Sequence, residues 1–86
     1  MATLPAATVS EIKNMLQLYC TGKFSPKISK WARNLSARVN SELGTGSITV
    51  SDDLAPFLEK VLIKALEGDN TSVKIKNQAA SFYNNL

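Results

Sequence analysis

Catalytic chemistry has few candidate residues in this chain of 86 residues. There is no His, the side chain used most often for general acid–base catalysis, so the single Cys, Cys20, has no His to activate it as a nucleophile. A single Cys without any His also cannot form a Cys/His metal site. Cys20 lies in a hydrophobic stretch, and we expect it to be a buried structural thiol.

Two further patterns contain residue types found in metal sites and phosphate-binding loops, but a structural role explains both patterns better than a functional one. Asp52 and Asp53 are adjacent acids just before a helical pattern, where carboxylates more often complement the positive end of a helix dipole than hold a metal. Residues 44–47, Gly-Thr-Gly-Ser, superficially resemble a phosphate-binding loop, but no Lys-Ser/Thr pair follows them. We therefore expect a protein that is not an enzyme and has no metal and no cofactor.

Positive charge is concentrated in one segment of the chain. Residues 23–38 contain five cations and no acid, although the net charge of the whole chain is only +3. Cations along one side of a helix can neutralise phosphates with little sequence preference, and a partly exposed Trp31 could stack on a base. The alternative is that Trp31 belongs to the core and the cations only keep a helix face solvated. The predicted nucleic-acid-binding residues are Lys23, Lys27, Lys30, Trp31, Arg33, Asn34 and Arg38.

Negative charge is concentrated in residues 42–69, which contain six acids and two lysines. Such charge asymmetry indicates a polyanionic partner, RNA or DNA first among them, or head-to-tail self-association. The basic segment could equally dock on an acidic protein surface. Leu18 and Ile63 lie outside the main apolar stripes of their helices, so the alternative hypothesis is a protein–protein interaction module or a homodimer that uses these two residues.

The clearest of the elements that must position these residues is a helix over residues 26–43. Ser25 is a suitable cap and Pro26 suits the first helical position, while Gly44 is a natural stop. Apolar residues recur along one side of the segment, and the cations lie on the opposite side and at the border of the apolar stripe.

The N-terminal part of the chain predicts a second helix over residues 9–20. Thr8 and Glu11 have the spacing of a capping box, in which each side chain satisfies a backbone donor of the first turn. Residues 1–7 are small and uncharged, and they predict a flexible N-terminal arm before a domain that spans residues 8–86.

The C-terminal half predicts two more helices, over residues 54–67 and 72–85. The first has a wide apolar arc and is expected to be the central helix. For residues 72–76 a strand is the competing prediction. Residues 47–50 alternate like a short strand, which would be an extended loop, pair with residues 73–75 or pair across a dimer.

Together these elements predict a compact all-α, four-helix domain, either bundle-like or irregular. No apolar run is long enough for a membrane span, and the N-terminus is a poor signal peptide, so we expect a cytoplasmic or nuclear protein. The sequence thus favours a small binding protein whose partner is a nucleic acid or an acidic protein, not a membrane or a small-molecule substrate.

Overall fold

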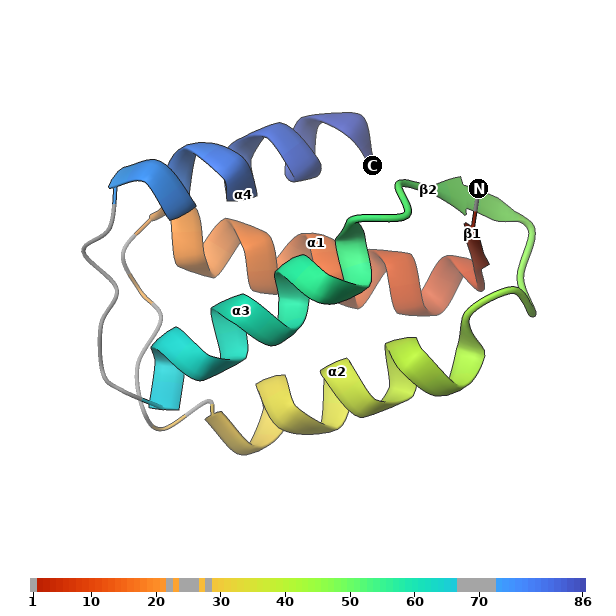
Figure 1. Ribbon diagram of the computed structural model, residues 1–86, viewed down its shortest axis with the longest axis horizontal. Helices are drawn as coiled ribbons and strands as arrows, with labels where there is room; N and C mark the ends of the chain where they lie inside the picture. Colours follow the sequence, from red (N-terminus) through yellow and green to blue (C-terminus); the bar gives the residue numbers. More distant parts are fainter. Residues whose placement is uncertain (1, 22, 24–26, 28, 67–72) are drawn as a thin grey trace.

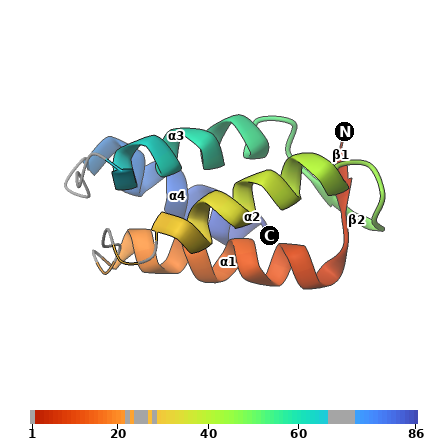
Figure 2. The same cartoon turned by 90° about the horizontal axis from the view of Figure 1, so that it is seen from below.

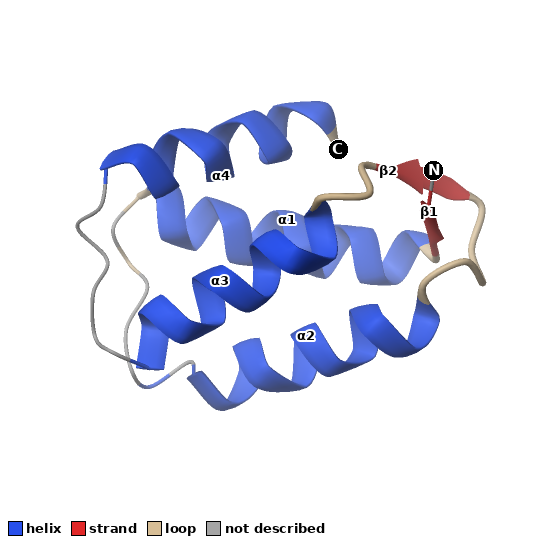
Figure 3. Cartoon of the chain, in the orientation of Figure 1, coloured by secondary structure: helices blue, strands red, loops and turns tan. Residues whose placement is uncertain are grey.

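The computed structural model describes residues 2–21, 23, 27, 29–66 and 73–86 (Figure 1). These residues form four helices and one small sheet, which confirms the predicted all-α domain with a short extended segment. Successive helices run in alternate directions, and the sheet lies at one end of them (Figure 3). The elements are β1 (Ala2–Leu4), α1 (Ala6–Cys20), α2 (Ser29–Glu42), β2 (Ile48–Val50), α3 (Leu54–Leu66) and α4 (Val73–Asn85).

Helices α1 and α2 each have two main helix partners. Helix α1 packs against α2 and α4, and α2 packs against α1 and α3. Helix α3 has one main helix partner, α2, which lies between α1 and α3 in the second view (Figure 2). The prediction that the helix after Asp53 would be central is therefore wrong. A wide apolar arc tells how much of a helix is apolar, but not how many neighbours surround it. The fully buried large side chains are Leu4, Ile12, Met15, Leu16, Tyr19, Leu35, Val39, Leu54, Leu58 and Val61.

The N-terminal residues form a strand in place of the expected loose arm. Ala2 pairs with Val50 and Leu4 with Ile48 in an antiparallel register. The side chain of Leu4 is fully buried in the core. This pairing is none of the three alternatives considered for residues 47–50, because the complementary strand lies more than forty residues earlier in the chain and is too short to be recognised from its pattern.

A glycine makes the close approach of this strand possible. A Cβ atom at Gly46 would overlap the backbone of Leu4 and Pro5. Gly44 ends α2 with a φ of 85° and donates its N–H to the carbonyl of Thr3 at 2.7 Å, which joins the turn after α2 to β1. The glycines of the loop at 44–47 therefore serve the backbone of the turn.

Helix α1 begins earlier than its apparent capping box. Pro5 is the N-cap residue, with extended backbone angles, and no side chain caps this end. Thr8 is the third residue of the helix and is buried, where its hydroxyl donates to the carboxylate of Glu42 on α2. The capping-box prediction is wrong because the Thr8 hydroxyl finds an acceptor on another helix.

The other helix ends agree with the sequence patterns where the structure describes them. Residues 25, 26 and 28 lie outside the described residues, so the predicted start of the helix over residues 26–43 cannot be compared with the structure. Residues 67 and 72, the predicted end of the third helix and start of the fourth, also lie outside them. Helix α2 stops at Glu42, one residue before its predicted end, and Leu43 is 42% exposed in the following turn. The predicted helix over residues 72–85 is confirmed from Val73 onward, and the competing strand over residues 72–76 is wrong for residues 73–76.

Candidate functional site

Trp31 lies at the contact between α1 and α2. Its indole Nε1 donates a hydrogen bond to Oε1 of Glu11 at 3.0 Å, and its ring packs against the core while remaining partly exposed. Helical spacing explains the position, since Trp31 lies at the border of the stripe formed by Ala32 and Leu35. An indole held in this way stabilises the contact between the two helices.

Arg38 shares the same carboxylate. Its guanidinium forms an ion pair with Oε2 of Glu11, so one acid on α1 receives both Trp31 and Arg38. Seven residues separate Trp31 from Arg38, which is two helical turns, and both therefore face α1. The positive charge of Arg38 is locally compensated, although its side chain is 41% exposed.

Four other cations are placed differently. Lys23 and Lys27 precede α2, and Lys30 and Arg33 lie in its first half. All four are exposed. None of them forms an ion pair with another residue of the part of the chain that the structure describes. We call Lys23, Lys27, Lys30 and Arg33 the basic surface.

The first half of α2 adds its own positive potential to the basic surface. Its first turn has no acidic residue, so no carboxylate of that turn offsets the positive end of the helix dipole. Lys30 and Asn34 are four residues apart and lie one above the other on the exposed side, while Arg33 is turned further around the helix. The arrangement offers an anion three kinds of partner: ammonium and guanidinium groups, a side-chain amide and the helix end.

Cys20 belongs to the packing between α1 and α4. Its Sγ lies 3.6 Å from the backbone carbonyl oxygen of Lys76, to which the thiol donates. Burial raises the pKa of the Cys20 thiol, which keeps it protonated and poorly nucleophilic at neutral pH. This agrees with a structural role.

The acids do not assemble into a catalytic or metal centre in the described residues. Asp52 and Asp53 are exposed beside the start of α3. No group of three or more His, Cys, Asp or Glu side chains in this part of the molecule could hold a metal ion. None of the described helices is both long and apolar enough to cross a bilayer.

The two candidate interface residues have different surroundings. Leu18 is partly buried and packs against the core, so it contributes to folding. Ile63 is 56% exposed on α3. Val73, at the start of α4, is 69% exposed, and it was not among the predicted interface residues.

The sequence pattern did not predict the role of Glu11, which binds Trp31 and Arg38 of α2. Its spacing from Thr8 suggested a local cap, and nothing in the local pattern connects it to Trp31 or Arg38. The only available signal was its place in the first half of a helix otherwise poor in charge.

Comparison with known proteins adds no family to these observations. No protein-family model matches the chain, and no curated protein and no solved structure is significantly similar to it. The fold defines a small all-α domain of four helices, in which α1 packs against α2 and α4, α3 packs against α2, and a two-stranded sheet lies at one end.

Proposed function

We propose that the protein is a non-enzymatic binding protein that uses the basic surface to bind the phosphate backbone of a nucleic acid. The observation that carries the proposal is the exposure of four cations around the start of α2 without an acidic partner among the described residues. Cations that make no internal ion pair are available to neutralise phosphates and to release the counterions condensed on them.

The proposed contact set is narrower than the sequence pattern suggested. Trp31 donates a hydrogen bond to Glu11 and Arg38 forms an ion pair with it, so both residues stabilise the contact between α1 and α2. Lys23, Lys27, Lys30 and Arg33 contact phosphates, and Asn34 supplies an additional donor. Contacts of this kind bind single or double strands with little preference for base sequence.

Salt dependence of binding tests the proposal. We expect the affinity for a labelled DNA duplex, measured by fluorescence anisotropy, to fall steeply with salt. Four phosphate contacts correspond to a slope of about −3.6 in a plot of log K against log[salt]. The double variant Lys30→Glu/Arg33→Glu removes two contacts and should reduce the slope to about −1.8.

A variant with the same change of net charge controls for non-specific attraction. Lys60 and Lys74 are exposed and lie on α3 and α4. The double variant Lys60→Glu/Lys74→Glu should keep most of the affinity and the slope of the unchanged protein. Equal losses in the two double variants would contradict a site on α2, and the absence of binding even at low salt would contradict the proposed function.

A second candidate function is association with protein, favoured by the exposure of Ile63 and Val73. Apolar side chains left in solvent by a small domain are typical of contact surfaces. A domain of this size also gains from a second copy, because its own core is thin. This candidate requires no nucleic acid, and its test is the oligomeric state described in the Discussion.

A further inference from the structure

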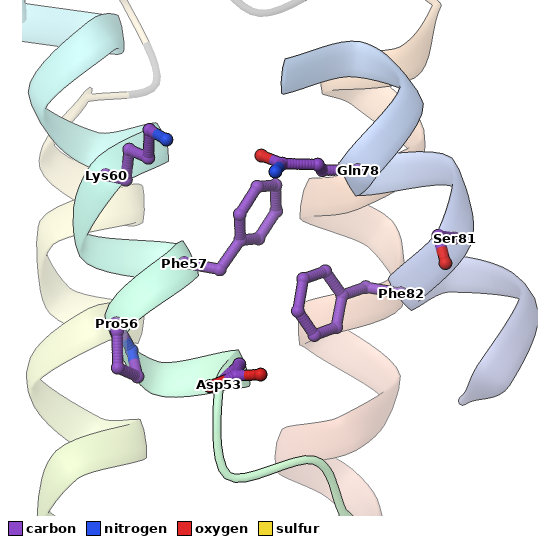
Figure 4. Close-up of a pocket in the computed structure, with 7 residues that line it drawn as sticks. All are labelled: Asp53, Pro56, Phe57, Lys60, Gln78, Ser81 and Phe82. Atoms are coloured by element: carbon purple, nitrogen blue, oxygen red, sulfur yellow. The ribbon is translucent and has the colours of Figure 1, made fainter. Parts of the chain in front are cut away.

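A pocket of about 350 Å³ lies between α3 and α4, and no residue of the basic surface lines it. This volume is at the lower end of the range for small-molecule sites. Figure 4 shows that the side chains of Phe57, Gln78 and Phe82 extend into the space between the two helices.

Two aromatic rings form the apolar part of this pocket. Phe57 of α3 and Phe82 of α4 are stacked, with ring centroids 4.7 Å apart and an interplanar angle of 27°. Phe57 is buried, and Phe82 is partly buried. A paired aromatic surface of this kind favours a flat, aromatic ligand, which gains both apolar burial and ring–ring contact.

The amide of Gln78 supplies a polar group without a partner. Its Oε1 atom is buried and accepts no hydrogen bond from the part of the chain that the structure describes. In Figure 4 the amide extends from α4 toward α3, beside the ring of Phe57. An unsatisfied buried acceptor costs the folded protein free energy, and a ligand that donates an N–H or O–H would recover it.

The two charged residues of the pocket lie at different ends. Lys60 is on the same side as the amide of Gln78 in Figure 4, and Asp53 is at the opposite end. Seven residues along α3 separate the two charged residues by about 10 Å. A complementary ligand therefore has its anionic group and its hydrogen-bond donor together at the Lys60 end, and no second anionic group near Asp53.

We propose that this pocket binds a small aromatic carboxylate that carries an N–H or O–H donor next to the carboxylate. Its ring lies against Phe57 and Phe82, its donor bonds to Oε1 of Gln78, and its carboxylate faces the ammonium group of Lys60. The site is separate from the proposed nucleic-acid surface, so either proposal can fail without the other.

Three small probes separate these contributions. 2-Aminobenzoate has the ring, the donor and the carboxylate, whereas benzoate has no donor and aniline has no carboxylate. In two-dimensional ¹H–¹⁵N NMR titrations we expect 2-aminobenzoate to bind with a Kd of about 1 mM and to shift signals of α3 and α4. Benzoate should bind about fivefold more weakly and aniline about threefold more weakly.

Two variants assign the contributions to residues. Gln78→Leu should abolish the preference for 2-aminobenzoate over benzoate, and it should also raise the Tm of the free protein, because it removes an unsatisfied acceptor. Lys60→Gln should abolish the preference over aniline. Lys74→Gln, on the exposed side of α4, is the matched control and should change neither preference.

Three results would overturn the proposal. The first is the absence of signal shifts at ligand concentrations well above 1 mM, and the second is a set of shifts outside α3 and α4. The third is an unchanged preference for 2-aminobenzoate in Gln78→Leu that has kept its fold, as judged by its Tm and its NMR spectrum. That result would mean that the Gln78 amide takes no part in binding.

Discussion

At the scale of single residues, Glu11 is the polar residue that most clearly joins two helices. One oxygen of its carboxylate accepts from Trp31, and the other pairs with Arg38. The carboxylate is 34% exposed and Arg38 is 41% exposed, so water weakens the ion pair. The hydrogen bond from the indole is part-buried and holds Trp31 at the contact between α1 and α2.

We predict that Glu11→Ala lowers the free energy of unfolding by about 1 kcal/mol, because it removes one hydrogen bond and one partly exposed ion pair. Urea denaturation followed by circular dichroism measures this change. The emission of Trp31 should also shift to longer wavelength as the indole loses its partner. Glu59→Ala is the control, since Glu59 and its hydrogen-bond partner Asn40 are both exposed, and its cost should stay within about 0.5 kcal/mol. Equal costs for both variants would contradict a special role of Glu11.

Cys20 makes stability depend on pH in the alkaline range. Its pKa is raised by burial above the ordinary value of 9.0, so the unfolded chain loses the thiol proton at a lower pH than the folded chain does. The contribution of the thiol to stability is therefore complete below pH 9.0 and is lost as pH rises toward the folded pKa.

We predict that the free energy of unfolding falls less steeply above pH 9.0 in Cys20→Ala than in the unchanged protein. Urea denaturation at a series of pH values from neutral to alkaline gives both slopes. The slopes of the two proteins should coincide at neutral pH, where the thiol is protonated in both states. Identical slopes over the whole alkaline range would contradict the raised pKa.

At the scale of elements, the small sheet connects the N-terminus to the middle of the chain. Strand β1 pairs with β2, and Leu4 inserts its side chain fully into the core. Gly46 lies so close to the backbone of Leu4 that only a residue without a Cβ fits there. The N-terminal strand therefore belongs to the folded domain and acts as one wall of its core.

We predict that Leu4→Ala lowers the free energy of unfolding by about 2–5 kcal/mol, the range for removing a fully buried leucine side chain. Thr49→Ala is the matched control in the neighbouring strand, where the side chain is exposed, and its effect should be within about 0.5 kcal/mol. Chemical denaturation of the unchanged protein, Leu4→Ala and Thr49→Ala measures the three free energies of unfolding. An unaffected Leu4→Ala protein would show that residues 2–4 behave as the loose arm expected from their composition.

At the scale of the whole molecule, the proposed surfaces occupy different elements. The basic surface lies before and along the first half of α2, and the pocket lies between α3 and α4. The exposed apolar residue Ile63 is also on α3, beyond the pocket-lining Lys60. The surfaces proposed for nucleic-acid binding, ligand binding and association therefore lie at separate places on the molecule.

We predict that Ile63→Glu converts any dimer into a monomer without unfolding the protein, because the side chain of Ile63 is 56% exposed and contributes little to the core. Sedimentation velocity at several protein concentrations measures the change. Leu18→Glu is not an equivalent test, since Leu18 packs against the core and its replacement would also destabilise the fold. A dimer that persists in folded Ile63→Glu would exclude this residue from the interface.

The sequence by itself determined the four helices, because each has apolar residues at helical spacing. All four predicted helices agree with the structure within a few residues over the part described, and Gly44 ends α2 as predicted. The exposed positions of Lys30 and Arg33 also follow from the helical period. These features depend on neighbours one or two turns away in the same segment, so local pattern is sufficient.

Only the tertiary structure decided how residues distant in the chain meet. Thr8 and Glu11 have the spacing of a capping box, but Thr8 donates to Glu42 of α2. Glu11 instead binds Trp31 and Arg38. Strand β1 pairs with β2, more than forty residues later in the chain. The pocket likewise exists only because α3 and α4 bring Phe57 and Gln78 together. The physical reason is the same in each case. A polar group or a short strand pairs with the partner that the packing of the helices places beside it. That packing depends on the whole chain and not on the local sequence.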